Sequence, residues 1–246
     1  MHRVKASVLL FDAALIGVVG RGFVTALWVV ALGHGALVTT SGVAMTPSET
    51  NTAAWALYIA SQLGAPLLSA IQCVIGVGLR SAARGDALRL FGLYMAAVGT
   101  VAFAGDWLGV IVGNYSELAA ALNIPSVLVQ VAATAPFAVL IVMLWRIGRR
   151  LRPAVDAVIV PVLVVAVAVP LVYLPTTLPT IERLWLGQAL WAVVITGALV
   201  PGPQATDADA PQPLRIPLLA WTFVLLMILI VRLMVQGIPL GTWPRT

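Results

Sequence analysis

The chain has 246 residues, of which 61% are hydrophobic and only 9% are charged. A soluble globular domain has roughly 45–50% apolar and about 25% charged residues, so this composition excludes a single water-soluble core and makes lipid the solvent for much of the apolar surface. The net charge is +5, but the arginines separate apolar runs instead of forming a basic patch with interleaved aromatic residues, so nucleic acid is not an expected partner.

The apolar residues form seven runs, and we predict that each crosses a bilayer as a helix. About 20 helical residues span a hydrocarbon core about 30 Å thick, and the alternation of a β-barrel strand is absent. The first run is longer than one span requires, so we expect it to tilt, to begin with an interfacial turn or to kink near residues 20–22. Alternatively, residues 157–200 form a re-entrant pair, and the number of membrane-spanning helices is then six. In chain order the predicted spans are 7–37, 53–79, 87–112, 124–145, 157–174, 184–200 and 216–235.

These runs predict an all-α, polytopic transmembrane bundle that occupies residues 1–246 as one domain. The longest polar stretches, 38–52 and 201–213, are too short to fold into a soluble domain of their own. Of the fourteen Lys and Arg residues, ten fall at the same side as the N-terminus, two at the other side and two within spans. Because basic residues are retained in the cytoplasm, we predict a cytoplasmic N-terminus and an external C-terminus in the plasma membrane.

The densest basic run follows the fourth span and faces the cytoplasm in this topology. It can contact anionic lipid headgroups, although a role as a topological anchor is enough to explain it. Its members are Arg146, Arg149, Arg150 and Arg152.

Two charged residues, Asp106 and Arg232, lie near the predicted outer ends of the third and seventh spans. A charge inside the bilayer costs at least about 2.5–3.5 kcal/mol, so such residues usually pair or line a polar cavity. The two differ in depth by only about 3 Å, so we predict an ion pair between them. The interpretations that stay open are a proton or anion site in an outward vestibule, a structural salt bridge, or an Arg232 whose side chain extends to the outer headgroups.

Arg21 and Asp12 are the other charged residues within predicted spans. Arg21 lies near the middle of the first run among glycines that permit close helix approach, and the sequence assigns it no role unless it joins the same ion-pair or transport site. Asp12 is predicted to be an interfacial charge near the basic run at 146–152. Glutamines in the spans favour interhelical hydrogen bonds over a translocation path; they are Gln62, Gln72, Gln130 and Gln188.

Several kinds of site are excluded by the residues that the chain lacks. Its two histidines, His2 and His34, leave no multi-histidine metal centre and no bis-histidine haem, and no nucleophile, phosphate-loop or zinc motif occurs. Lys5 is the only lysine and lies outside the bundle, so a retinal Schiff base is excluded. We therefore expect no cofactor and no metal.

The first functional hypothesis is a non-enzymatic accessory, assembly or sensory subunit, with membrane lipids, other membrane subunits or further copies of the chain as partners. The alternative is a carrier or channel for a small solute, an ion or protons that uses Asp106, Arg232 and Arg21. An enzyme acting on lipid is the third hypothesis, in which Asp106 is the one acid or base near an interface.

Overall fold

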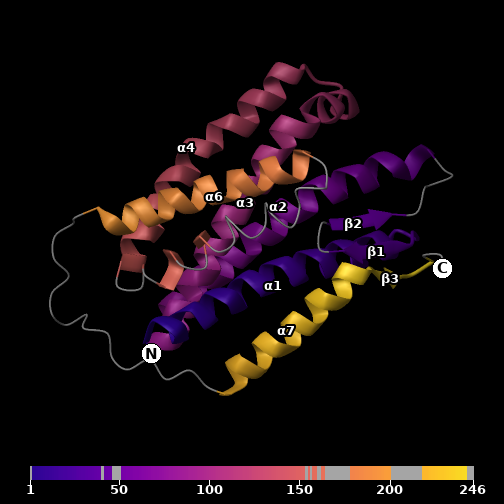
Figure 1. Ribbon diagram of the computed structural model, residues 1–246. Coiled ribbons are helices and arrows are strands. Elements are labelled where there is room, and N and C mark those ends of the chain that lie inside the picture. Colours follow the sequence, from indigo (N-terminus) through magenta and orange to yellow (C-terminus); the bar gives the residue numbers. More distant parts are fainter. Residues whose placement is uncertain are drawn as a thin grey trace.

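The computed structural model describes residues 2–39, 42–45, 51–152, 155, 157–159, 162–163, 178–200 and 218–242. Within these residues the chain is mostly helical, with a small sheet at one end of the helices (Figure 1). The start of α1 and the strand β3 lie at opposite ends of the molecule. The elements are α1 (His2–Ala31), β1 (Ala36–Thr39), β2 (Gly42–Met45), α2 (Asn51–Ala82), α3 (Asp86–Leu122), α4 (Ser126–Leu151), α6 (Leu178–Leu199), α7 (Leu218–Gln236) and β3 (Ile238–Leu240).

Within the described part of the chain, four helices are long and apolar enough to cross a membrane. They contain the segments Ala6–Ala31, Gly64–Ala82, Asp86–Leu108 and Ser126–Leu151. Two shorter apolar segments, Leu186–Leu199 and Trp221–Gln236, belong to α6 and α7. The expected helical membrane architecture is thereby supported in its coarse form. Most of the predicted fifth span, 157–174, lies outside the described residues.

Each described helix overlaps one of the predicted apolar runs, but several boundaries differ from the prediction. The first helix is continuous from His2 to Ala31, so it has no break at residues 20–22. The third helix extends to Leu122, ten residues beyond the predicted 87–112, and ends at Asn123, which has a left-handed φ of 52° and donates its backbone N–H toward Ala119 and Ala120. Helical backbone satisfies its own hydrogen bonds, so polar residues at 114–117 do not end it.

The sheet is an element that the apolar runs did not predict. β1 is the central strand and pairs antiparallel with both β2 and β3, in the register Val38↔Val43 and Val38↔Ile238. Val38 is fully buried, and it packs with residues of α1 and with Met234 of α7. The prediction that the first span continues to residue 37 is therefore wrong, because the chain leaves the helix after Ala31 and returns as a strand.

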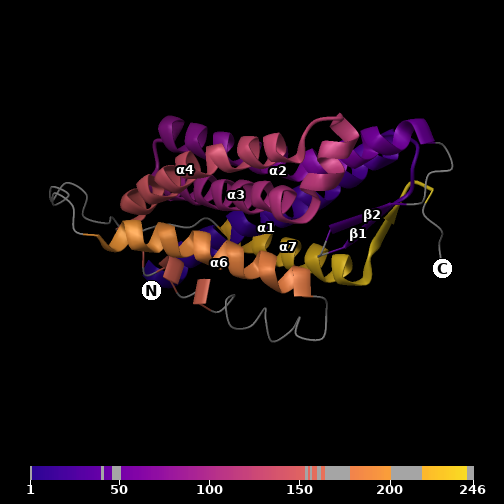
Figure 2. The ribbon, with the colours of Figure 1, turned by 90° about the horizontal axis from the view of Figure 1, so that it is seen from above.

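α3 is the central helix of the described part of the chain and packs against α1, α2, α4 and α6 (Figure 2). Its contact with α2 is close because glycines of each helix face backbone of the other. A Cβ added to Gly99 would lie 2.7 Å from the Ser69 carbonyl oxygen, and one added to Gly92 would lie 2.7 Å from that of Gly76. Substituting either glycine therefore requires the two helix backbones to separate.

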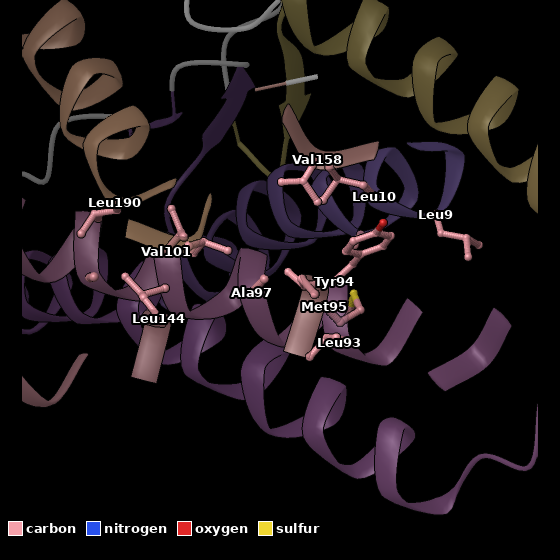
Figure 3. Packing of buried hydrophobic residues seen from close by; sticks show 14 of the residues in the cluster. Leu9, Leu10, Leu93, Tyr94, Met95, Ala97, Val101, Leu144, Val158 and Leu190 are labelled. Carbon is pink, nitrogen blue, oxygen red and sulfur yellow. The ribbon is translucent and has the colours of Figure 1, made fainter. Parts of the chain in front are cut away.

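Around α3 lies the larger apolar core, in which Tyr94 is fully buried (Figure 3). Leu9, Leu10 and Ala13 of α1 contribute one side of this core. Leu144 of α4 and Leu190 of α6, together with further residues of those helices, contribute the other sides.

Candidate functional site

An ion pair joins the first and third helices within the candidate spans. The Arg21 guanidinium donates from Nη1 to the Asp106 carboxylate over 2.9 Å, and its Nε donates to the Gly17 carbonyl oxygen over 3.0 Å. About a quarter of each side chain is exposed, 26% for Arg21 and 28% for Asp106. The pair is thus largely shielded from solvent. Its two charges neutralise each other within the candidate spans, where a lone charge would be costly.

Arg21 replaces Arg232 as the partner that we predicted for Asp106. Arg232 is exposed on α7, and α7 packs against α1 and β1. Arg21 contacts Asp106 because α1 is continuous through this level and packs directly against α3. The predicted pairing of Asp106 with Arg232 is therefore wrong, although the expectation that Asp106 has an arginine partner is met.

A serine of α2 completes the charged site. The buried Ser69 hydroxyl lies 3.1 Å from the same Asp106 oxygen and 2.9 Å from the Ala65 carbonyl oxygen. A hydroxyl has a single hydrogen, so Ser69 can donate to the carboxylate or to its own helix but cannot fully satisfy both. The occupancy of this hydrogen bond can therefore change without any movement of the backbone.

Ser69 was not predicted as a site residue, although the sequence contained a signal for it. Ser69, Gln72, Cys73 and Gly76 have the spacing of residues that share one face of a helix. This small and polar face is the one that α2 turns toward α3 and α1.

Gln72 forms a second polar link, between α2 and α1. Its side-chain amide donates to the Ala13 carbonyl oxygen over 2.9 Å, and Met95 Sδ lies 3.6 Å from the same nitrogen. A Cβ added to Gly17 would lie 2.7 Å from the Gln72 Oε1 atom, so the absence of a side chain at Gly17 makes room for this amide. The predicted interhelical role of Gln72 agrees with this geometry.

Asp12, which we predicted to be an interfacial charge, is buried at 4% exposure on α1 and belongs to the candidate span Ala6–Ala31. Its Oδ1 atom has no hydrogen-bond partner among the described residues. The Tyr94 hydroxyl and the Gln188 Oε1 are buried without a partner in the same sense. An unsatisfied buried polar atom costs about 1–3 kcal/mol, so these three atoms of α1, α3 and α6 are unusual for a core.

The basic run after the fourth span lies at the end of α4, and Arg146, Arg149, Arg150 and Arg152 are all exposed. Arg150 is close enough to Arg80, near the end of α2, for the two charges to repel. The Ser7 hydroxyl donates to the Ala157 carbonyl oxygen over 3.1 Å, which brings the start of α1 to the segment that follows this run. Basic ends of separate helices therefore gather at one end of the described structure.

The polar groups of α1, α2 and α3 form one track, defined by Asp12, Gln72, Arg21, Asp106 and Ser69. Asp12 and Arg21 are nine residues apart on α1, which corresponds to about 13 Å along the helix axis. Carboxyl, amide, hydroxyl and guanidinium groups are the kinds of side chain that bind ions or exchange protons. Within the described ranges, no three His, Cys, Asp or Glu side chains are grouped so that they could hold a metal ion.

No family model, no curated protein and no solved structure matches the chain. A function is therefore inferred from the chain's own side chains, among which the polar track between α1, α2 and α3 carries the most chemistry.

Proposed function

We propose that the chain is a multi-pass protein of the plasma membrane with seven crossing helices, a cytoplasmic N-terminus and an external C-terminus. Support comes from the apolar helices and from the gathering of basic residues at the end where α1 begins and α4 ends. In this topology the three-stranded sheet lies on the outer side, and the arginines of the α4 terminus contact the inner headgroups.

We propose further that the protein is a non-enzymatic carrier or channel that moves protons, alone or coupled to a small solute, along the polar track. One observation carries this proposal: the Arg21–Asp106 pair, 2.9 Å long, stands in a shared site with the Ser69 hydroxyl inside the candidate spans. Intramembrane carboxylates and their partners commonly form proton relays and ion paths because a purely structural role rarely justifies the cost of burying them.

The interior of the α1–α2–α3 unit favours this proposal over the subunit hypothesis. A subunit would present a face of small residues to a partner, whereas Gly76, Gly92 and Gly99 are used in contacts within the chain. A purely structural bundle would also have an apolar interior, whereas Asp12, Ser69, Gln72 and Thr100 are buried. An accessory, assembly or sensory subunit is the competing proposal, which the first experiment distinguishes.

The first experiment measures the mass and composition of the particle extracted in mild detergent. A single chain or a homo-oligomer is expected. The protein is then reconstituted in liposomes that contain a pH-sensitive dye, and a membrane potential is imposed. Proton flux above that of protein-free liposomes is expected.

The Asp106→Asn variant tests the role of the site in this flux. It should abolish the flux while the circular dichroism spectrum and the elution volume stay unchanged. Arg232→Gln is the matched control, since it removes an exposed charge of α7, and its flux should equal that of the original protein. A stable complex with other polypeptides would favour the subunit proposal. Equal flux with and without protein would reject the carrier.

A further inference from the structure

The polar track contains two carboxyl groups in opposite surroundings. Asp106 accepts hydrogen bonds from the Arg21 guanidinium at 2.9 Å and from the Ser69 hydroxyl at 3.1 Å. Asp12 is 4% exposed, and its Oδ1 atom has no partner among the described residues. One acid therefore has its negative charge balanced by a cation, and the other has no cation within bonding distance among the described residues.

We propose that Asp12 is the side chain of the track that binds and releases a proton. This inference rests on the proposed function and names the acid that performs it. An ionised carboxylate in apolar surroundings is strongly disfavoured unless it is paired, and a proton taken from water neutralises it. Binding forms one O–H bond on the carboxylate and release breaks it, so no further reactant is needed.

The helices that pack against α1 place few ionisable groups near Asp12. α2 contributes the neutral Gln72 amide, which donates to the carbonyl oxygen of the adjacent Ala13, while Arg80 lies eight residues further along α2 toward the basic end. From α3 comes Tyr94, whose hydroxyl has no partner among the described side chains and points toward the turn of α1 that contains Leu10 (Figure 3).

The charges on α1 itself and on α7 do not balance Asp12 either. Arg21 lies nine residues beyond it on α1 and is committed to Asp106. Arg232 is exposed on α7, two residues before Met234, which contacts the position of Gly22. The side chains of Arg3 and Lys5, at the start of α1, lie outside the described part of the chain.

Asp12 occupies a position suited to exchange protons between the basic end and the ion pair. The Ser7–Ala157 hydrogen bond lies five residues before it on α1, or about 8 Å nearer to the basic end. On its other side, the Gln72 amide bridges Ala13 and the space beside Gly17, whose carbonyl oxygen bonds Arg21. The Gln72 amide therefore lies between Ala13, the neighbour of Asp12 in the chain, and Gly17, whose carbonyl oxygen accepts from Arg21.

Infrared difference spectroscopy of the reconstituted protein tests the assignment. Exposed carboxyl groups are mostly ionised above about pH 5. A C=O band of a protonated carboxyl that persists above this pH and disappears as the pH is raised further therefore reports a buried acid. The original protein should show this band, Asp12→Asn should lack it, and Asp106→Asn should keep it.

A band that persists in Asp12→Asn, or no titrating band in the original protein, overturns the inference. Asp12→Glu keeps the carboxyl and should shift the band instead of removing it, so the test remains decisive if the asparagine variant does not fold. Asp12→Asn should also lose the proton flux, by at least tenfold, and the glutamate variant should keep part of it.

The two proposals fail in different ways. Flux that is unchanged in a folded Asp12→Asn variant would reject Asp12 as the proton-binding group and leave the carrier standing. Absence of flux in the original protein, together with a band that depends on Asp12, would reject the carrier and leave the proton assignment intact.

Discussion

The Arg21–Asp106 pair should contribute to folding through the interaction of its two members and not through either residue alone. Opposite unit charges 2.9 Å apart attract by about 6 kcal/mol at an effective dielectric constant of 20. Desolvation of both ions removes several kcal/mol of this gain, and the exposed quarter of each side chain keeps some hydration. Breaking the pair leaves one uncompensated charge, so Arg21→Gln and Asp106→Asn should each lower the free energy of unfolding by about 3 kcal/mol.

The double variant leaves no charge unpaired and should therefore lose much less than the sum of the two single losses. We expect it to lose about 3–4 kcal/mol, which gives a coupling free energy of about 2–3 kcal/mol. The assay is unfolding in mixed micelles with increasing denaturing detergent, followed by circular dichroism, on all four proteins under one condition. Losses that add within about 0.5 kcal/mol would show that the two side chains do not interact, and would refute the ion pair as the centre of the site.

Further predictions concern packing, helix termination and the second arginine. Gly99→Ala should lower the free energy of unfolding by about 1–3 kcal/mol because the added methyl group would clash with the α2 backbone. Gly78→Ala, at a position with nothing within 4 Å, should be neutral or stabilising, and unfolding in denaturing detergent compares the two variants. Asn123→Ala should cost about 1–2 kcal/mol and Asn123→Gly almost nothing, since φ is 52°; equal melting temperatures would contradict this. Arg232→Gln should change the free energy of unfolding by less than about 0.5 kcal/mol, and a loss as large as that of Arg21→Gln would place Arg232 in the site.

The sequence predicts the helices well because a membrane span is determined by local composition. Every described helix overlaps a predicted apolar run, and the boundaries of α4 and α7 differ from the runs by a few residues. The sheet was missed for the opposite reason. β1 at Ala36–Thr39 pairs with β3 at Ile238–Leu240, about two hundred residues later in the chain, and no local sequence pattern contains such a pairing. From the sequence alone, the residues of β1 were therefore assigned to the end of an apolar run.

Depth in the membrane can also be estimated from the sequence, but the direction in which a side chain faces around its helix cannot. Arg232 and Arg21 lie at similar levels, because Met234, two residues after Arg232, contacts the position of Gly22. Successive residues of a helix point about 100° apart, so Gly22 can face α7 while Arg21 faces Asp106 on α3.

α1 packs against both α3 and α7, and it therefore supplies the arginine for Asp106 from its own surface. Of the two arginines at this depth, Arg21 pairs with Asp106 because its helix, α1, packs against α3. The same arrangement commits Arg21 to Asp106 and leaves Asp12, nine residues earlier on α1, without a basic partner in the described part of the chain. The proton site that we propose therefore combines two carboxyl groups in different surroundings: Asp106 of α3, whose charge is balanced by Arg21, and Asp12 of α1, which has no such partner among the described residues.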